Sequence, residues 1–258
     1  MSSDDPTGGV RKTVRRWLGG DEKKRAVDEL YAGNDFLEAY ARHTDLRVEA
    51  DRKEAIGGLW DEMGRHQFEF LKLHGLEPFH TLLDIGCGTL RGGRHFIPYL
   101  EAGHYTGFDI SPRAIEAARE LVRAEGLEDK RPDILLDHAK RLDFALLGGR
   151  RFNFVLAQSV FSHLLEEHIE EAFANIHKAL TRDGYFFFTF RPAEEGVEGG
   201  RVVRGKKDFA YPVSYFEDVA HRHGLDVENL SEAYAHPHGQ AMMLARPHLA
   251  ERQTAAAG

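Results

Sequence analysis

Two glycines and two carboxylates mark where this chain could do chemistry. Gly86 and Gly88 follow an apolar, β-prone run, and Asp84 comes just before them. A strand that ends in a glycine turn and continues as a helix presents backbone N–H groups, which a ligand can approach closely. Asp109 ends the next apolar run, where a carboxylate can accept both hydroxyls of an adenosine ribose. The pattern indicates a site for a nucleoside-bearing cofactor.

The turn lacks the residues that usually bind phosphate groups. A dinucleotide-binding turn has a third glycine, which lets the pyrophosphate rest on the helix N-terminus, but Leu90 and Arg91 occupy the two positions where it could stand. The Gly-Lys-Ser/Thr sequence of ATPases is also absent. Asp84 would repel a pyrophosphate and attract an ammonium or sulfonium group. S-adenosylmethionine has a ribose, a cationic sulfur and no phosphate, so it fits this charge pattern better than NAD.

Four sequence motifs in order resemble those of class I S-adenosylmethionine-dependent methyltransferases. They are LLDIGCGTLRGG, YTGFDIS, DILLDHAKRLDF and FNFVLAQSVFSHL, and the resemblance covers roughly residues 75–246. It implies S-adenosyl-L-methionine as the cofactor. It also implies an α/β fold: a Rossmann-like, doubly wound, seven-stranded and mostly parallel sheet with an antiparallel last strand, preceded by an N-terminal helical extension.

The resemblance implies which residues contact the cofactor. The glycine turn would hold the methionine end, Asp109 the ribose, and Asp137 would face the adenine amino group. A helix N-cap is the alternative role for Asp137. The residues expected to bind the cofactor are Asp84, Gly86, Cys87, Gly88, Arg91, Asp109, Ile110, Asp137, His138 and Gln158.

Hydrophobic patterns predict the elements that position these residues. Strands are expected at 81–85, 104–108, 133–136, 152–157, 185–190, 225–230 and 240–246. Helices are expected at 91–100, from Pro112 to about Arg123 with Ser111 as N-cap, at 166–180, and from Ser214, as the cap, to Gly224. Loops at the carboxyl ends of parallel strands bind ligands in open α/β sheets. The candidate residues should therefore meet at one edge of the sheet.

His163 is the candidate catalytic base. Methyl transfer is an in-line displacement that needs an aligned, unprotonated nucleophile and requires no metal. His163 lies on the loop after the fourth predicted strand, and histidine can accept a proton near neutral pH. An orienting or packing role for His163 is the alternative.

Other residues are candidates for contact with a substrate. Trp60 lies in the N-terminal helices, where it could instead pack against the sheet. The expected substrate-contacting residues are Trp60, Tyr185, Arg191, Tyr211 and His236. Two His-x-His pairs, His221/His223 and His236/His238, have no cysteine partner and no His-Glu-x-x-His motif, so no metal site is predicted.

The chain divides into four predicted segments. We expect flexible tails at 1–21 and 249–258, an N-terminal helical cap at 22–76, and a methyltransferase core at 77–248. Residues 191–210 are polar and glycine-rich, which is typical of a mobile loop beside a substrate.

Composition limits the partners. The 258 residues carry a net charge of −8, whereas a protein that grips nucleic acid over a large face is usually basic. Cys87 is the single cysteine, and there is neither a long apolar run nor a signal peptide. We therefore expect a cytoplasmic protein without a membrane anchor, and a homodimer is left open.

The sequence predicts methyl transfer to an oxygen or nitrogen of a small-molecule metabolite or natural-product intermediate. Methyltransferases that act on exocyclic amines of nucleic-acid bases carry Asp/Asn-Pro-Pro-Tyr after the fourth strand, where this chain has Gln-Ser-Val-Phe. Two alternatives stay open. The fold could use the cofactor for another reaction, such as aminopropyl transfer, or it could bind the cofactor as a non-catalytic partner protein.

Overall fold

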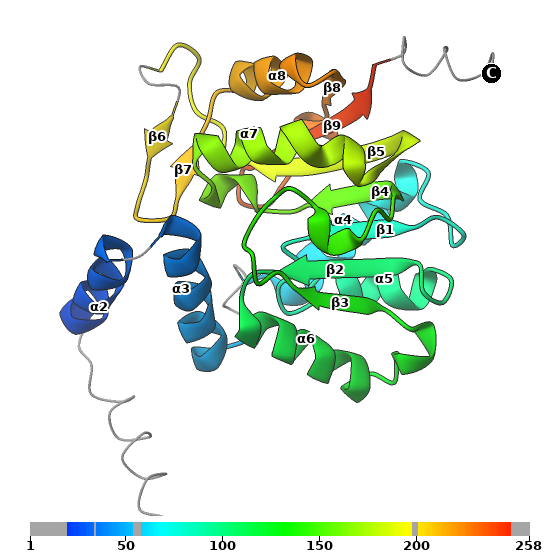
Figure 1. Ribbon diagram of the computed structural model, residues 1–258, viewed down its shortest axis with the longest axis horizontal. Helices are drawn as coiled ribbons and strands as arrows, with labels where there is room; N and C mark the ends of the chain where they lie inside the picture. Colours follow the sequence, from blue (N-terminus) through cyan, green and yellow to red (C-terminus); the bar gives the residue numbers. More distant parts are fainter. Residues whose placement is uncertain (1–19, 34, 54–57, 198–200, 249–258) are drawn as a thin grey trace, which may run out of the picture.

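The computed structural model describes residues 20–33, 35–53, 58–197 and 201–248, with side chains described from Arg25 on. The predicted tail at 249–258 and nearly all of that at 1–21 lie outside these ranges. Within them, a seven-stranded sheet has the order β3-β2-β1-β4-β5-β9-β8 (Figure 1). β1 to β5 pair in parallel, and β9 is antiparallel to both β5 and β8. The predicted fold class is confirmed.

The strands agree closely with the sequence pattern. Their bounds are β1 (Leu82–Ile85), β2 (Tyr105–Asp109), β3 (Asp133–Leu136), β4 (Phe152–Ala157), β5 (Leu180–Phe190), β8 (Leu225–Asn229) and β9 (Ala241–Pro247). β3 and β4 have the predicted bounds. β5 begins earlier than predicted because Leu180 already pairs with Phe152, so the preceding helix must also end earlier.

Helices surround this sheet. Their bounds are α2 (Gly20–Ala32), α3 (Phe36–Ala50), α4 (Trp60–Leu73), α5 (Gly93–Tyr99), α6 (Pro112–Ala124), α7 (Glu166–Asn175), α8 (Val213–Arg222) and α9 (Ser231–Tyr234). Short 3₁₀ turns are η2 (Glu128–Lys130), η3 (Ala145–Leu147), η4 (Phe161–His163) and η5 (Ile176–Lys178). None of the helices in the described ranges is long and apolar enough to cross a membrane.

The two faces of the sheet carry separate hydrophobic clusters. Side chains alternate along a strand, so Phe186, Phe188 and Phe190 of β5 join the cluster under α7 and α8, whereas Phe187 joins the one under α4, α5 and α6. All four phenylalanines are fully buried. Burying each contributes roughly 1.5–3 kcal/mol to folding, which fixes the sheet that positions the loops at its carboxyl edge.

α3 stands at the carboxyl edge of the sheet, beside the strand ends (Figure 1). Its Asp45 accepts hydrogen bonds from the hydroxyl of Ser111 (2.6 Å) and the backbone N–H of Arg113 (3.0 Å), at the start of α6. Ser111 also caps α6 as predicted, with its hydroxyl accepting from the backbone of Ala114. The helices before β1 therefore have two roles, because α3 borders this edge and α4 packs into the core.

The segment from 191 to 210 contains a small hairpin that the sequence pattern did not predict. β6 (Val202–Val203) pairs with β7 (Phe209–Ala210) in antiparallel fashion. The predicted cap of α8 is wrong. Glu195 accepts from the backbone N–H groups of Val213 (3.0 Å) and Ser214 (3.4 Å), and the Ser214 side chain bonds the same carboxylate instead of the helix.

Candidate active site

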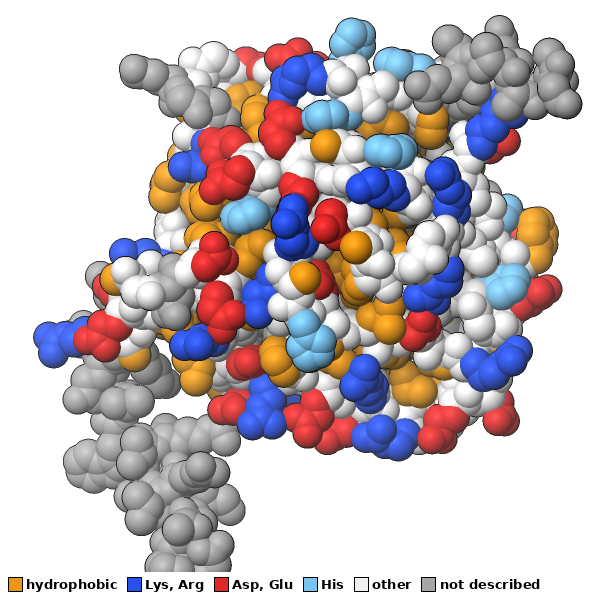
Figure 2. All heavy atoms as spheres, viewed as in Figure 1, with side chains coloured by type: hydrophobic (Ala, Val, Ile, Leu, Met, Phe, Trp, Pro, Cys, Tyr) orange, Lys and Arg blue, Asp and Glu red, His pale blue; other side chains and the backbone are white. Residues whose placement is uncertain are grey.

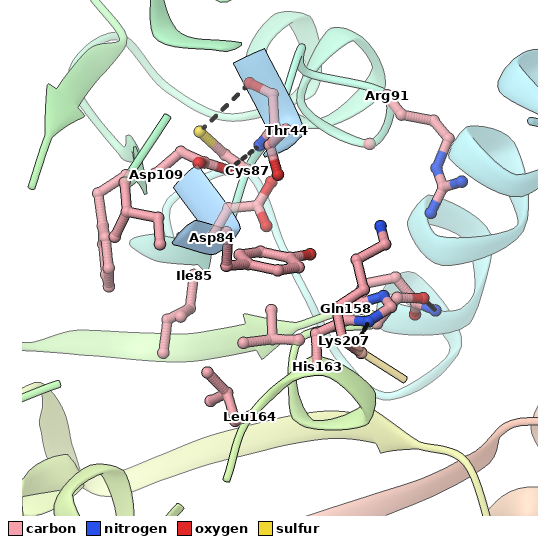
Figure 3. A pocket seen from close by; sticks show the side chains of 18 of the residues that line it. Thr44, Asp84, Ile85, Cys87, Arg91, Asp109, Gln158, His163, Leu164 and Lys207 are labelled. Atoms are coloured by element: carbon pink, nitrogen blue, oxygen red, sulfur yellow. Dashed lines mark hydrogen bonds between the residues drawn. The ribbon is translucent and has the colours of Figure 1, made fainter. Parts of the chain in front are cut away.

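A cavity of about 490 Å³ opens at the carboxyl ends of β1, β2, β4 and β5, with α3 along one side. This volume lies in the range of small-molecule sites. Figure 3 shows Asp84 and Asp109 on one side of it and His163 and Lys207 on another. The predicted site residues that line it are Asp84, Gly86, Cys87, Gly88, Arg91, Asp109, Ile110, Asp137, Gln158, His163, Arg191 and His236.

The glycine turn has the backbone that its sequence predicts. Gly86 and Gly88 have φ values of +66° and +56°, in the left-handed region that favours glycine. A Cβ on Gly86 would also lie 2.8 Å from the Val160 side chain. Leu90, which stands where a third glycine could be, adopts φ +66° despite its side chain. The turn is therefore tightly wound, and Gly86 and Gly88 both line the cavity.

Asp109 connects the turn to the second strand. Its carboxylate accepts hydrogen bonds from the backbone N–H groups of Gly88 (3.0 Å) and Ser111 (2.8 Å). Burial raises the pKa of Asp109 to about 6, and these backbone hydrogen bonds oppose the increase. Each carboxylate oxygen accepts one of these hydrogen bonds and can accept another. Two adjacent hydroxyls could donate these further hydrogen bonds.

Asp84 is buried beside the turn. Tyr105 donates a hydrogen bond to its carboxylate (2.7 Å), a role for this tyrosine that the sequence did not reveal. Burial raises the pKa of Asp84 to about 7, while the Tyr105 hydrogen bond and the charge of Arg91 favour the ionised form. A cationic ligand in the cavity would favour the ionised form further.

Arg91 reaches the cavity from the residues before α5, and α4 packs closely behind it. The guanidinium donates to the carbonyl of Gly58 (3.2 Å), and burial lowers its pKa. Gly64 of α4 permits the close approach, because a Cβ there would lie 2.2 Å from the carbonyl oxygen of Arg91. α4 thus supports the turn as well as the core.

Asp137 organises the loop after β3. Its carboxylate accepts from the backbone N–H groups of Ala139 (3.0 Å), Lys140 (3.1 Å) and Arg141 (2.9 Å). Residues 138–144 form no helix, so the N-cap alternative does not hold. His138 is exposed and does not line the cavity, whereas Lys140 and Arg141 do.

Gln158 and His236 form a buried network at the end of β4. Tyr234 donates to the Gln158 amide oxygen (2.7 Å), and the Nε2 atom of His236 lies 3.0 Å from the amide nitrogen. The backbone N–H of His238 donates to His236 Nδ1 (3.0 Å). Burial lowers the pKa of His236 to about 4. His236 is therefore neutral near pH 7, and the lone pair on its Nδ1 already accepts the His238 N–H, which disfavours it as a base.

His163 has one engaged ring nitrogen. Its Nδ1 lies 2.7 Å from the carbonyl oxygen of Lys207 and 3.2 Å from a carboxylate oxygen of Asp208. Both neighbours are acceptors, so Nδ1 carries the hydrogen and the Nε2 lone pair is left for a proton. The ring also stacks on Tyr40 of α3, with centroids 5.4 Å apart. The hydrogen bond from His163 to Asp208 holds the pKa of the Asp208 carboxyl below its usual range.

Three predicted substrate residues lie outside the cavity lining. Tyr185 is in the middle of β5 and stacks on Phe154 at 5.2 Å. Tyr211 is fully buried and donates to the carbonyl of Leu164 (2.6 Å). Trp60 begins α4 and is buried. Each of the three side chains therefore packs against other parts of the protein. None of them lies at this cavity, where the substrate contacts were expected.

Sequence reasoning missed the contribution of α3. Its side chains line the cavity at Leu37, Tyr40, His43, Thr44 and Arg47. Their spacing of three or four residues is that of one helix face, so the pattern was present in the sequence.

Among the described residues, no group of three or more His, Cys, Asp or Glu could hold a metal ion.

Comparison with known proteins relates this geometry to a family. Residues 83–186 match a family model described as a methyltransferase domain. The glycopeptide N-methyltransferase MtfA, complexed with S-adenosylmethionine, is 15% identical with a TM-score of 0.55, over 72% of this chain and 94% of that one. The magnesium protoporphyrin IX methyltransferase of Synechocystis PCC 6803, with bound SAH, is 15% identical with a TM-score of 0.61, over 83% and 100%.

A further match has the same fold. The DhpI–SAM–HEP complex is 16% identical with a TM-score of 0.58, over 83% of this chain and 99% of that one. At these identities the solved structures show the fold, while the family model covers the glycine turn, Asp109, Asp137 and His163. Residues 83–186 are thus similar to a methyltransferase domain, and the chain has the fold of these S-adenosylmethionine-dependent methyltransferases.

Proposed function

We propose that this protein transfers a methyl group from S-adenosylmethionine to an oxygen or nitrogen atom of a small molecule. One observation carries the proposal: Asp84, Asp109 and the glycine turn share a cavity with His163, whose Nε2 is left to accept a proton. Structural neighbours crystallised with S-adenosylmethionine or SAH support the choice of cofactor.

The described residues fit this cofactor. Asp109 would accept the ribose hydroxyls, and the buried Asp84 would face the cationic methionine end. Arg91, across from Asp84, would complement the methionine carboxylate. Asp137 and the loop that it organises would border the adenine. When bound, the cofactor supplies an electrophilic methyl group on a cationic sulfur.

His163 would act as the general base. The acceptor lone pair forms the new bond to the methyl carbon as the bond from that carbon to sulfur breaks. The proton of the acceptor O–H or N–H passes to His163 Nε2, and Asp208 stabilises the imidazolium from the Nδ1 side. The Tyr40 ring, which stacks on His163, holds the imidazole plane. The catalytic role thus uses the tautomer that the Lys207 carbonyl and Asp208 impose.

Surface charge supports a small acceptor. On the face shown in Figure 2, basic and acidic side chains are mixed, with no continuous basic stripe, whereas nucleic-acid backbones are usually bound by such stripes. The cavity must also hold cofactor and acceptor together within about 490 Å³. The neighbours with this fold act on acceptors as different as a glycopeptide and magnesium protoporphyrin IX, so the fold does not name the acceptor.

The test is a search for labelled product. The full chain is incubated with metabolite extract and cofactor carrying a deuterated methyl group, and the products are read by mass spectrometry. We expect labelled products with the wild type and fewer with Asp109→Ala at the same, subsaturating cofactor concentration. Products that carry an aminopropyl group would contradict methyl transfer. Cofactor binding without any product would favour a non-catalytic role.

A further inference from the structure

Three basic side chains line the same cavity as His163. Arg47 comes from α3, Arg191 follows β5, and Lys207 lies in the β6–β7 hairpin. The charges of Lys207 and Arg191 both act on Asp208, and the charge of Arg47 acts on Lys207. The three side chains, which come from separate parts of the chain, therefore form one positively charged region, called here the basic side of the cavity.

The cations around the cavity differ in their partners. Lys140 is paired with Glu38 (2.8 Å) and Arg141 with Glu171 (2.7 Å). Among the described residues, by contrast, no carboxylate forms an ion pair with Lys207 or Arg191. Asp208, whose pKa the charges of Lys207 and Arg191 lower, is engaged by His163. At Arg191 and Lys207 the cavity therefore carries positive charge that no ion pair with a described carboxylate balances.

This excess charge is costly without a ligand. Burial and the neighbouring Arg47 lower the pKa of Lys207 to about 8. Burial and the charges of Lys207 and Arg47 also lower the pKa of His43, on the same side, to about 4. Charges withdrawn from water are normally paired, and Arg191 and Lys207 are both partly buried. The chain as a whole is acidic, with a net charge of −8. The local excess of cations therefore does not follow from the overall charge.

We propose that Arg191 and Lys207 bind an anionic oxygen group of the methyl acceptor, so that the acceptor is a small organic anion carrying a carboxylate or a phosphate. This inference rests on the proposed function and adds the acceptor's chemical class. A guanidinium binds either group through two parallel hydrogen bonds, and an ammonium adds a point charge. Held by these two residues, the acceptor would present its nucleophile towards His163.

The first experiment measures anion binding directly. Inorganic phosphate and succinate are titrated calorimetrically into the full chain, with and without SAH, and into Arg191→Gln and Lys207→Gln. We expect each substitution to weaken binding of at least one anion by about tenfold or more. Lys206→Gln is the matched control, because Lys206 is exposed and pairs with Asp28 (3.4 Å). The preferred probe distinguishes a phosphate from a carboxylate.

Several results would overturn the inference. Equal anion affinity in wild type and both variants would do so, as would an equal loss in Lys206→Gln, which would indicate general charge attraction. If the two variants instead lose SAH affinity by the same factor, the basic side binds the cofactor and not the acceptor. Melting temperatures check that both variants fold. Because titration without SAH needs no cofactor, it decides the anion site even if the proposed function fails.

A second experiment concerns the acceptor itself. Metabolite extract is separated on an anion-exchange column before incubation with the deuterated-methyl cofactor. We expect labelled products from the retained, anionic fraction, with kcat/KM reduced at least about tenfold in Arg191→Gln and Lys207→Gln. Labelled products from only the unretained fraction would contradict an anionic acceptor and leave methyl transfer intact. The absence of label in every fraction would count against the proposed function instead.

Discussion

The Nδ1 atom of His163 lies 3.2 Å from a carboxylate oxygen of Asp208, so the turn after β4 is joined to the β6–β7 hairpin. The carbonyl of Lys207 accepts from the same nitrogen at 2.7 Å. These contacts fix the tautomer that leaves Nε2 for a proton. The segment expected to contact the substrate thus also positions the candidate base, and the acidic residue that does so lies far from it in the sequence.

Substituting this pair should separate a base from a packing residue. His163→Ala is expected to lower kcat by about 100-fold or more, because proton transfer is lost. Asp208→Asn should lower kcat by roughly tenfold with little change in KM, since the imidazolium loses its stabilising charge. Steady-state kinetics with the identified acceptor provide both values. Asp208 would then be a positioning residue.

A second histidine–aspartate pair provides the control. His248 Nδ1 lies 2.6 Å from Asp226 at the β8 edge of the sheet, away from the cavity lining. Asp226→Asn should leave kcat and KM unchanged. A loss of only a few-fold in His163→Ala, or a drop in melting temperature that accounts for the loss, would return His163 to an orienting or packing role.

Removing the Asp109 carboxylate should weaken cofactor binding. Asp109→Ala loses the bonds to Gly88 and Ser111 together with the proposed ribose contacts, and hydrogen bonds to charged groups contribute about 1.5–3 kcal/mol each. We expect the Kd for SAH to rise at least about tenfold in calorimetry. Asp133→Ala is the control, because Asp133 starts β3 and pairs with Arg150 (2.7 Å). An unchanged Kd in Asp109→Ala would refute the ribose assignment.

The sequence predicted the parts of the fold that depend on local pattern. Strand periodicity gave the bounds of β3 and β4, and the glycine turn placed Asp84 and Asp109 at one cavity. Of the ten residues expected to bind cofactor, His138 alone lies outside the cavity lining. His138 lies elsewhere because the backbone after Asp137 bends around the Asp137 carboxylate. Hydrophobic periodicity does not encode this interaction.

The remaining errors involve contacts between distant segments. Glu195, and not Ser214, caps α8, and Asp208 reaches His163; neither partner is near in sequence. Tyr185 was expected at the substrate, but its place in the middle of β5 turns it to a packed face of the sheet. Such pairings depend on how the elements pack, so one sequence without the fold does not specify them.

Cofactor affinity should depend on pH through Asp84. Burial raises the pKa of its carboxyl to about 7 in the ligand-free protein, and a cationic ligand binds the ionised form. Below about pH 7 the carboxyl must release its proton before binding, so affinity should fall by up to about tenfold per pH unit. Calorimetry with S-adenosylmethionine from about pH 8.5 down to about pH 5.5 measures this.

Asp84→Asn serves as the control for the pH series. It should bind the cofactor more weakly at pH 8 and show a flatter profile, with a decline only where Asp109, whose pKa is about 6, takes up its proton. Equal Kd values for the wild type at pH 8 and pH 6 would mean that no cationic group lies near Asp84. The methionine end would then have to be placed elsewhere in the cavity.

Close packing of α4 on the glycine turn makes Gly64 a sensitive position. Alanine usually favours a helix over glycine by about 1 kcal/mol, but a Cβ at Gly64 would lie 2.2 Å from the backbone oxygen of Arg91. Because a backbone carbonyl moves only with its turn, the overlap should outweigh the propensity and lower stability by about 1–3 kcal/mol. Denaturant unfolding measures that loss, and calorimetry should show weaker SAH binding as Arg91 shifts.

Gly33→Ala is the matched control, since a Cβ there meets nothing closer than 3.9 Å. If Gly64→Ala matched Gly33→Ala in both measurements, α4 would not be pressed against the turn, and its support of the cofactor site would be disproved.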